Sequence, residues 1–393
     1  MPPRSPWPSP LRLSPQQQVY CAFFLYALAM GGIFPRVGDI QQALGITERV
    51  LGLALIGTAS GTMVSLTLAS RWLDRWGHGQ VLRWGLPLLA LAFAGASWAT
   101  GPLALYLLLV PAGLVIGAVE IVVNLEADRV EHQLGQRIMS RAHACWSIGF
   151  FSAGLLGAGA AQWGLSVQAQ LAAMVLLVAG ASAVLLRGFA PARHRPDSHA
   201  GAAPHWARPT RHTGLLLLAT LGAMVLEGAA IDWSAIYMRD VFAAPPFAAG
   251  AAVALGALAQ AAARWVADGF VARHGPLRVA RCLQTLLGLG AALVLLAPHP
   301  ALALLGIALM GVGSSAIFPL AMSAAAQATD RPAALNVAAL AQTAFIAFLL
   351  GPPLLGWVAT AFGIRWSFGV GLPLVLVGWW AARALAPSPP RPH

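Results

Sequence analysis

Residues 71–83 read RWLDRWGHGQVLR, and residues 267–281 read ADGFVARHGPLRVAR. Both stretches contain an arginine, a glycine two positions later and a second arginine six positions after the glycine. The matching residues are Arg75, Gly77 and Arg83 in the first stretch and Arg273, Gly275 and Arg281 in the second. From Arg75 to Arg273 the offset is 198 residues, and it is the same for the other two pairs. A repeat at half the length of a 393-residue chain predicts two halves that are built alike.

The composition places most of the chain inside a lipid bilayer. Hydrophobic residues make up 58% of the sequence and charged residues 9%, against about 25% charged residues in ordinary soluble domains. Uncharged runs recur along the whole length, and about 20 apolar residues in a helix cross a hydrocarbon layer about 30 Å thick. Because a chain in lipid must satisfy its own backbone hydrogen bonds, the uninterrupted Leu, Ala and Val runs predict membrane helices.

Hydropathy predicts an all-α membrane protein whose twelve transmembrane helices form two pseudo-symmetric six-helix bundles. The predicted helices cover residues 17–40, 48–70, 81–99, 103–126, 139–162, 166–187, 212–237, 247–268, 279–297, 301–326, 334–360 and 366–386. The segment between the sixth and seventh helices, GFAPARHRPDSHAGAAPHWARPTR, is rich in Pro, His and Arg, which is typical of a linker. We therefore predict an N-terminal bundle over residues 1–187, a cytoplasmic linker over 188–211 and a C-terminal bundle over 212–393.

The arginines give the predicted helices an orientation. All 24 basic residues are arginine. Four of them, Arg36, Arg49, Arg239 and Arg365, fall on one predicted side, and the other 20 (24 minus 4) fall in the tails, loops and helix ends of the other side. Arg and Lys accumulate in cytoplasmic loops. Both termini are therefore predicted to be cytoplasmic, and the chain is predicted to be an integral protein of the bacterial cytoplasmic (inner) membrane.

The sequence argues against several other classes of protein. The arginines are spread over short loops and do not cluster on one face, so no nucleic-acid partner is predicted. The cysteines, Cys21, Cys145 and Cys282, are far apart along the chain, which predicts neither a disulfide framework nor a metal site. Without lysine there is no nucleotide-binding loop of the GxxxxGK[ST] kind. No nucleophile and base are paired in the loops, so neither an enzyme nor a cofactor is predicted.

Polar side chains interrupt the apolar pattern in residues 117–147, GAVEIVVNLEADRVEHQLGQRIMSRAHACWS. Glu120 and Asn124 are four residues apart, so they share one face of a helix. A charged group at the bilayer centre costs about 2.5–3.5 kcal/mol on insertion scales, so such groups usually face a protein interior or a water-filled path. Glu120 is therefore a candidate to hold a proton in dry surroundings and release it in wet ones. The alternative is a structural ion pair with Arg137 or Arg141.

Three more ionisable residues in predicted helices are candidate proton-coupling groups. His143 could relay a proton, or it could only bond to a backbone carbonyl group. Glu227 lies near the middle of the seventh predicted helix, and Asp232 follows five residues later. The two carboxylates can serve one pocket only if the helix is unwound after Gly228. Otherwise Asp232 could lie beside Trp233 at the membrane interface, where aromatic residues accumulate.

Several other polar or aromatic residues are candidate solute ligands. Arg36 could hold an anion through its planar guanidinium group, or it could be neutralised by Asp39, three residues later. The uncharged candidates are Asn124, Trp146, Gln260, Asn336 and Gln342. For the amide side chains among them, the ordinary alternative is a hydrogen bond between helices, worth about 0.6 kcal/mol.

The repeated loops carry candidate gating residues. They are Arg71, Asp74, Arg75 and Gly77 in the first loop and Arg264, Asp268, Arg273 and Gly275 in the second. Ion pairs among them would close one side of the protein in one state and break in another, which shifts the equilibrium between the states. The alternative is that these charges only set the orientation of the helices.

The first of these loops resembles the signature of the major facilitator superfamily, an acidic residue, Arg, one residue and Gly followed by further basic residues. Asp74, Arg75, Gly77 and Arg83 carry it here, and the likeness covers essentially the whole chain. Within the superfamily the chain is similar to the fucose permease-like branch. The residues that carry this second likeness are Glu120, Asn124, Arg137, Met139, His143, Ser147, Gly149, Glu227, Asp232, Trp233 and Gly351 to Pro353. It departs from the sugar permeases in lacking an aspartate within the first helix, since Asp39 lies at its outer end.

The resemblance implies a secondary active transporter that moves a small polar, sugar-like solute by alternating access, in symport with protons. It also implies a monomer in the lipid bilayer. One alternative is a proton-coupled exporter of drugs or metabolites, and another is a membrane receptor or scaffold without turnover. A polar cavity around Asn124 and Asn336 would favour the symporter, whereas a cavity dominated by Trp146, Phe150, Phe345 and Phe348 would favour the exporter.

Overall fold

The computed structural model of the chain describes residues 13–136, 138–193, 207–328, 330–331 and 333–386, without the side chains of 69–74, 140, 333 and 334. The described residues are helical nearly throughout and contain no strand. Eleven segments among them are long and apolar enough to cross a membrane. The predicted all-α membrane fold is confirmed.

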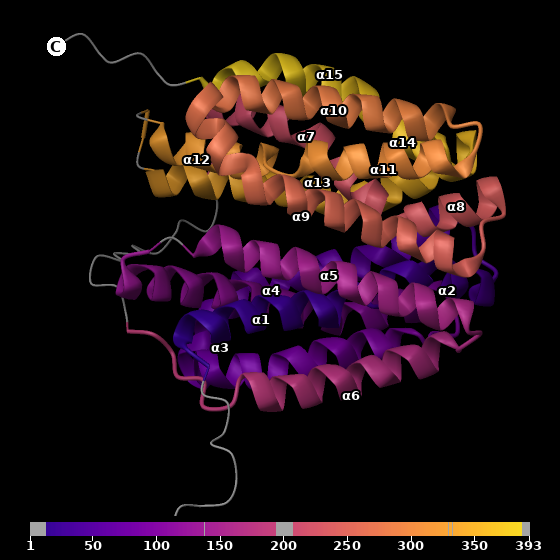
Figure 1. Cartoon of the computed structure of the whole chain (residues 1–393), viewed down its shortest axis with the longest axis horizontal. Helices are drawn as coiled ribbons and strands as arrows, with labels where there is room; N and C mark the ends of the chain where they lie inside the picture. Colours follow the sequence, from indigo (N-terminus) through magenta and orange to yellow (C-terminus); the bar gives the residue numbers. More distant parts are fainter. Residues whose placement is uncertain (1–12, 137, 194–206, 329, 332, 387–393) are drawn as a thin grey trace, which may run out of the picture.

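The helices of the first half lie together in one layer of the molecule (Figure 1). They are α1 (Pro15–Gly31), the 3-10 helix η1 (Phe34–Arg36), α2 (Val37–Leu44), α3 (Glu48–Ala96), α4 (Pro102–Leu134), α5 (Met139–Gln162) and α6 (Val167–Leu185). Within this layer α1 packs on α5, and α3 packs on both α4 and α6.

The helices of the second half form the other layer. They are α7 (Arg211–Asp232), α8 (Ser234–Phe242), α9 (Pro246–His274), α10 (Pro276–Leu296), α11 (Pro300–Ser314), α12 (Ile317–Gln327), α13 (Ala333–Phe362), α14 (Trp366–Gly369), α15 (Gly371–Ala381) and η2 (Ala382–Leu385). Here α7 packs on α13 and α15, and α11 packs on α9 and α10. We call the first layer the N-bundle and the second the C-bundle.

Most helices begin at residues that suit a helix N-terminus. The side chains of Ser14, Thr47, Ser166 and Thr210 each accept a hydrogen bond from the backbone N–H of the third helical residue, one of the N–H groups that the helix itself leaves without a partner. Other helices start with a proline, whose fixed backbone angle suits the first turn. These prolines are Pro102, Pro246, Pro276 and Pro300.

The sequence repeat is also a repeat in backbone conformation. Gly77 lies within α3 at φ 69° and ψ 153°, and Gly275 separates α9 from α10 at φ 80° and ψ 156°. This region of backbone angles is essentially restricted to glycine. At Gly77 the chain turns back, so α3 comprises two of the predicted crossings, 48–70 and 81–99. Four other predicted crossings are each broken into two or three shorter elements, α1 with η1 and α2, α7 with α8, α11 with α12, and α14 with α15 and η2.

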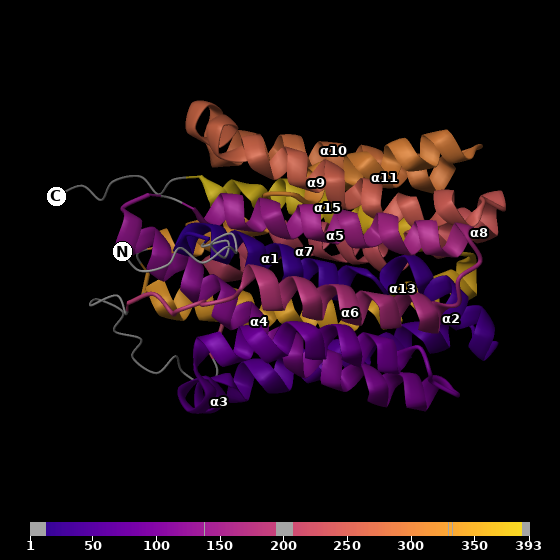
Figure 2. The same cartoon turned by 60° about the horizontal axis from the view of Figure 1, so that its bottom comes forward.

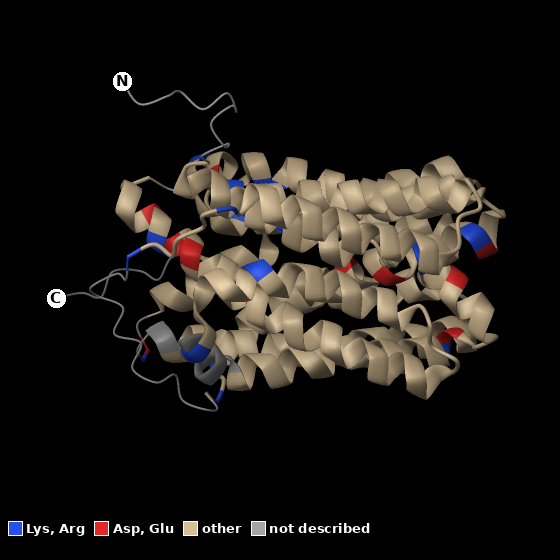
Figure 3. Ribbon diagram, turned by 90° about the horizontal axis from the view of Figure 1, so that it is seen from below, with Lys and Arg blue, Asp and Glu red and all other residues tan. Residues whose placement is uncertain are grey.

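Arginines gather at one end of the helices (Figure 3). We call this the basic end. It holds Arg75, Arg141, Arg211 and Arg273, and α1 begins and η2 ends there (Figure 2). The opposite end holds Arg49, Arg239 and Arg365.

The two bundles meet along two lines of small residues. On α5 and α9, a Cβ atom added at Gly154 would lie 3.0 Å from the Cβ of Ala254, and one added at Gly250 would lie 2.8 Å from that of Ala158. On α3 and α13, a Cβ added at Gly52 would lie 2.3 Å from the carbonyl oxygen of Pro352. Such close approach of helix backbones is possible only without larger side chains.

Polar contacts join the bundles at the opposite end. Arg239 of α8 donates to the carbonyl oxygen of Gly38 at 2.7 Å and to Oε1 of Gln41 at 3.1 Å. The backbone N–H of Arg49 donates to Oγ1 of Thr360 at 3.0 Å. These bonds and the lines of small residues hold the bundles together at this end.

Candidate functional site

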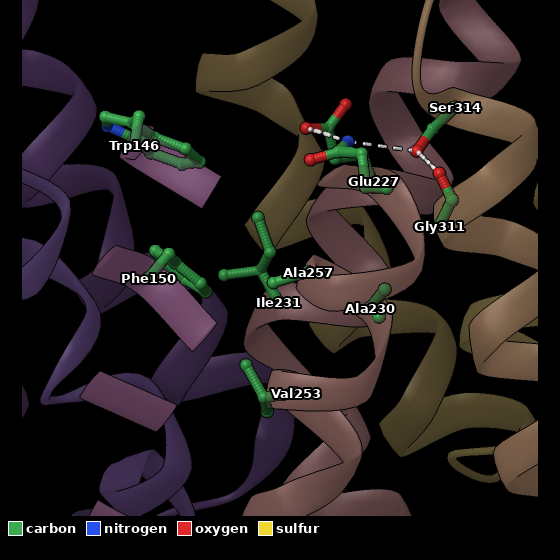
Figure 4. A pocket seen from close by; sticks show the side chains of 11 residues that line it. Trp146, Phe150, Glu227, Ala230, Ile231, Val253, Ala257, Gly311 and Ser314 are labelled. Atoms are coloured by element: carbon green, nitrogen blue, oxygen red, sulfur yellow. Dashed lines mark hydrogen bonds between the residues drawn. The ribbon is translucent and has the colours of Figure 1, made fainter. Parts of the chain in front are cut away.

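A small cavity lies between the bundles, with walls from four helices (Figure 4). Its volume is about 20 Å³, enough for about one water molecule. Trp146 and Phe150 of α5 form the wall on the N-bundle side. The C-bundle wall comes from Glu227, Ala230 and Ile231 of α7, Val253, Gly256, Ala257 and Gln260 of α9, and Gly311 and Ser314 of α11.

A hydrogen-bond network surrounds Glu227 in the C-bundle wall. Gln260 donates through Nε2 to Oε1 of Glu227 at 2.8 Å and lies 3.2 Å from Oγ of Ser314. Ser314 donates in turn to the carbonyl oxygen of Gly311 at 3.3 Å. The carboxylate of α7 is therefore held in place by side chains of α9 and α11, as expected for a functional group that must keep its orientation.

Arg264 adds a positive charge to this network. Its Nη2 lies 3.8 Å from Oε1 of Glu227, and the two side chains remain 23% and 24% exposed. At that distance and exposure the two groups attract each other without forming a sealed ion pair. Its Nε donates to the carbonyl oxygen of Ser315 at 2.9 Å. Ser315 lies in the break between α11 and α12, where a carbonyl group is available for a partner outside the helix.

Arg264 lies on α9, within the predicted helix 247–268, and is one turn from Gln260. It was predicted as a gating residue together with Asp268 and Arg273, and that role remains a prediction. Sequence reasoning did not predict its contact with Glu227, because the partner lies on another helix.

Glu120 of α4 has a different set of partners. Asn124 donates through Nδ2 to Oε1 of Glu120 at 3.1 Å and to the backbone carbonyl of Glu120 at 2.8 Å. The hydroxyl group of Tyr26 on α1 also bonds to the Glu120 side chain. These described partners are both uncharged and both lie in the N-bundle. Arg137, the first partner of the alternative ion pair, lies outside the described residues, and Arg141 is exposed.

His143 and two aromatic residues occupy the side of α5 that faces the C-bundle. His143 is half-buried, and its ring packs edge-on against Phe23 at a centroid distance of 5.1 Å. The positive charge of Arg264 acts on the imidazole group of His143. Trp146 stacks on Phe150 at 5.4 Å, and Tyr26 lies 6.4 Å from Trp146. Tyr26, Glu120, His143 and Trp146 thus form the N-bundle side of the candidate site.

Asp232 is separated from this group. Helix α7 runs unbroken to Asp232, so the unwinding that would bring both acids into one pocket does not occur. Five residues at about 100° each turn Asp232 by about 140° from Glu227. Among the described residues, no hydrogen bond or ion pair reaches Asp232. Trp233 is fully buried, which corrects the alternative that placed it at the membrane interface.

Arg36 lies outside the predicted solute site. It is buried in the N-bundle, where it donates to Asp39 at 2.5 Å, to the carbonyl oxygen of Leu165 at 2.9 Å and to Gln170 at 3.5 Å. Asp39 satisfies the charge locally, as the alternative prediction had it. The arginine is thereby fixed between η1 and the start of α6 and does not line the cavity described above.

Asn336 and Gln342 of α13 are likewise removed from the cavity. Asn336 is fully buried; it donates to Oδ1 of Asp330 at 2.7 Å and accepts from Nε of Arg331 at 2.6 Å. The hydrogen bond from Asn336 lowers the pKa of Asp330 below its usual range. Gln342 accepts a hydrogen bond from the backbone N–H of Ala207 at 3.0 Å. Both side chains hold the start of α13 to neighbouring loops.

The candidate gating residues are only partly described. The side chains of Arg71 and Asp74 lie outside the described residues. Arg75 and Arg273 are exposed at the basic end, and Asp268 is exposed there with a partner. The gating role of these residues remains a prediction.

Sequence reasoning missed Tyr26 and Ser314. A single tyrosine or serine in an apolar helix has no spacing pattern to distinguish it, and only the packing of α1 on the N-bundle and the end of α11 bring these hydroxyl groups to Glu120 and Gln260.

The sequence profile of the Major Facilitator Superfamily matches residues 19–243 and 215–393, and so covers nearly the whole chain. The chain belongs to the major facilitator superfamily. An uncharacterized transporter of Sinorhizobium fredii, y4wD, is 31% identical over 374 residues, which cover 93% of this chain and 97% of that protein.

Solved structures of this superfamily have the same fold. A point mutant of the nucleoside transporter NupG is similar with a TM-score of 0.75 at 15% identity, over 95% of this chain and all of that one. A D-xylose–proton symporter is similar with a TM-score of 0.70 at 12% identity, over 94% and 95% of the two chains. At these identities the likeness establishes the fold alone.

Proposed function

We propose that this member of the major facilitator superfamily is a symporter that moves a small polar, sugar-like solute together with a proton, as its resemblance to the fucose permease-like branch implies. The observation that carries the proposal is the placement of Glu227. This carboxylate borders a cavity between the bundles and is bonded by Gln260, so movement of the bundles changes its surroundings. A carboxyl group whose surroundings alternate between dry and wet can bind and release a proton in each cycle.

The arrangement of the bundles supports alternating access. If the basic end is cytoplasmic, as the distribution of arginine predicts, then the end held together by Arg239 and Arg49 faces outward. The cavity of about 20 Å³ is far smaller than the roughly 300–1,000 Å³ of ordinary ligand pockets. A solute therefore binds only after the bundles have parted, and rocking of one bundle against the other provides that motion.

The residues of the site divide into proposed roles. Glu227 and Glu120 exchange protons, with His143 beside them. Gln260, Asn124 and Trp146 contact the solute, because ligand pockets combine an apolar wall with a few polar groups that fix orientation. The glycines of the repeated loops, Gly77 and Gly275, with Arg75 and Arg273 beside them, belong to the gate at the basic end.

A proton-coupled exporter is the second candidate. The stacked rings of Trp146 and Phe150 favour it, since they form the N-bundle wall of the cavity. Phe345 and Phe348, the other two residues of that prediction, do not line this cavity. Asn124 and Asn336, the two residues of the symporter prediction, do not line it either. Glu227, Gln260 and Ser314 place a group of polar side chains in an otherwise apolar C-bundle wall, and this group supports the symporter.

Transport by proteoliposomes tests both proposals. Purified protein in liposomes is assayed for exchange of labelled solutes and for proton uptake over a panel of sugars and apolar drugs. We expect proton uptake that depends on a polar solute and is lost in Glu227→Gln. The matched control is Asp330→Asn, an exposed acid in the loop before α13 that lies away from the cavity. Uptake driven by an apolar drug would favour the exporter, and binding without exchange would indicate a receptor.

A further inference from the structure

Arg264 and His143 lie at about the same level of α9 and α5, the two helices that pack against each other between the bundles. Helices α5 and α9 are antiparallel, and contacts join Gly154 to Ala254 and Ala158 to Gly250. In each pair the residue numbers add up to 408. The same register, continued toward the basic end, brings position 143 level with 264 and 265, in accord with the charge that Arg264 exerts on His143. One cationic side chain and one imidazole ring therefore lie on the basic-end side of the cavity, each from a different bundle.

The guanidinium group of Arg264 has unused hydrogen-bonding capacity. A guanidinium group carries five N–H donors. Nε donates to Ser315, and Nη2 is 3.8 Å from Glu227, beyond the 2.7–3.2 Å of an ordinary hydrogen bond. No further hydrogen bond joins it to a described residue, and nearly a quarter of the side chain remains exposed. Such a planar group suits bidentate binding of a carboxylate or phosphate.

The carboxylate that lies 3.8 Å from Arg264 is that of Glu227, the group proposed to take up the proton. When Glu227 is protonated, Arg264 is left with an uncompensated charge in the protein interior, which is strongly unfavourable. A neutral sugar cannot replace the lost negative charge, whereas an acidic solute can. Conversely, an acidic solute next to ionised Glu227 would be repelled.

We propose that the solute is a small hydroxylated carboxylic acid and that Arg264 binds its carboxylate, with His143 opposite. This inference rests on the proposed symport and narrows its solute from polar to acidic. Proton and anion then enter the site together and leave its net charge unchanged. Because each stabilises the binding of the other, the coupling is reciprocal.

The remaining charged groups are compatible with this assignment. Glu120 is bonded to Tyr26 and Asn124 within the N-bundle. Asp232 is turned to another side of α7, about 140° from Glu227. Asp268 lies one turn beyond Arg264 on α9 and is exposed. A cationic solute would have to bind beside Arg264 and His143. Preferential transport of cationic solutes by the protein would therefore contradict the proposal.

The test uses series of related solutes of similar size that carry a negative, a neutral or a positive charge. Counterflow into proteoliposomes compares D-galacturonate, D-galactose and D-galactosamine, and then D-gluconate, D-glucitol and D-glucamine. We expect the acid of a series to exchange at least about tenfold faster than its neutral and amine analogues, because truncating one partner of a buried charge pair has effects of this size or larger. Arg264→Gln should abolish this preference, whereas Arg278→Gln, which changes an exposed arginine at the start of α10, should retain it.

Three outcomes would overturn the inference. Faster exchange of the neutral or amine analogue would refute an acidic solute and leave the proposed transport function standing. An unchanged acid preference in Arg264→Gln would remove Arg264 from the binding site. No exchange of any compound by the wild-type protein would contradict the proposed function together with this inference. Because a charge preference is a ratio, a merely structural loss in Arg264→Gln would not change it. If that variant does not fold, Arg264→Lys, which keeps the charge without the planar group, should weaken exchange of the acid and keep the preference.

Discussion

Two carboxylates inside the membrane-spanning region, Glu120 and Glu227, have different surroundings. Glu120 is bonded to Asn124 and Tyr26, both neutral and both in its own bundle. Glu227 is bonded to neutral Gln260 but also lies 3.8 Å from the cationic Arg264. Protonation of Glu120 changes only its own charge. Protonation of Glu227 also removes the counter-charge of an arginine, so its effect extends to whatever else that arginine can bind. We therefore expect the proposed coupling step to depend more on Glu227, in the C-bundle, than on Glu120.

The largest effect is expected from Glu227→Gln. Glutamine keeps an oxygen that can accept from Gln260 but cannot carry a proton. We expect proton-driven accumulation to fall at least about 100-fold, while counterflow, which needs no proton cycle, persists. Accumulation in response to a pH gradient, measured beside counterflow in the same liposomes, checks this. If Glu227→Gln still accumulates solute in response to the pH gradient, Glu227 does not carry the coupled proton and the proposed difference between the two acids is wrong.

A smaller effect is expected from Glu120→Gln. Its neutral partners can bond to an amide as well as to a carboxylate, so accumulation should fall by about tenfold or less. The same pH-gradient assay measures it. If Glu120→Gln abolishes accumulation and Glu227→Gln does not, the roles of the two acids are reversed.

The donors to the two acids provide a matched test of the same comparison. Gln260→Leu removes the donor at 2.8 Å from Glu227, and an unsatisfied buried group costs about 1–3 kcal/mol, so KM should rise about tenfold. Asn124→Leu leaves Tyr26 bonded to Glu120, so its effect on KM should be smaller. Initial rates over a range of solute concentrations measure both. An equal or larger effect of Asn124→Leu would contradict the proposed contact between Gln260 and the solute.

The repeated glycines should affect stability in equal measure. Gly77→Ala and Gly275→Ala each force a side chain into backbone angles that favour glycine, at a cost of about 1–3 kcal/mol. Thermal unfolding in detergent should show similar decreases in midpoint for the two variants and none for Gly269→Ala, where a methyl group meets open space. A decrease at only one of the two sites would indicate that the two backbone positions do not require glycine to the same degree.

The smallest effect concerns an acid outside the membrane-spanning segments, Asp330. The hydrogen bond from Asn336 lowers its pKa, so the contribution of this bond to stability is present above the ordinary aspartate pKa of about 3.9 and is lost as pH falls through the lowered value. In Asn336→Ala the pKa should rise toward the ordinary value. Carboxyl ¹³C NMR of labelled aspartate measures it. An unchanged pKa would show that Asn336 is not the cause of the shift.

The fold was predictable from the sequence because hydropathy distinguishes residues inside the bilayer from residues outside it. This distinction is enough to locate twelve membrane-crossing helices. The repeat around Gly77 and Gly275 was visible for a similar reason, since only glycine adopts the backbone angles found there. The rotation of each helix about its axis was not predictable. The rotation of α7 and α9 places Arg264 beside Glu227, and the rotation of α13 places Asn336 against a loop. These rotations depend on packing between helices that are far apart in sequence. The break at Ser315 was also missed, although Pro319 marks it, because proline lacks the N–H group that would bond to the carbonyl oxygen of Ser315, four residues earlier.

The line of glycine and alanine between α5 and α9 has a consequence for inhibition. Two helix faces without protruding side chains pack closely, but few side-chain contacts remain between them once the helices begin to separate. A flat, lipid-soluble compound that binds between Gly154 and Ala254 would keep α5 and α9 apart. It would stop the transport cycle from within the bilayer, by a route that needs no resemblance to the transported molecule.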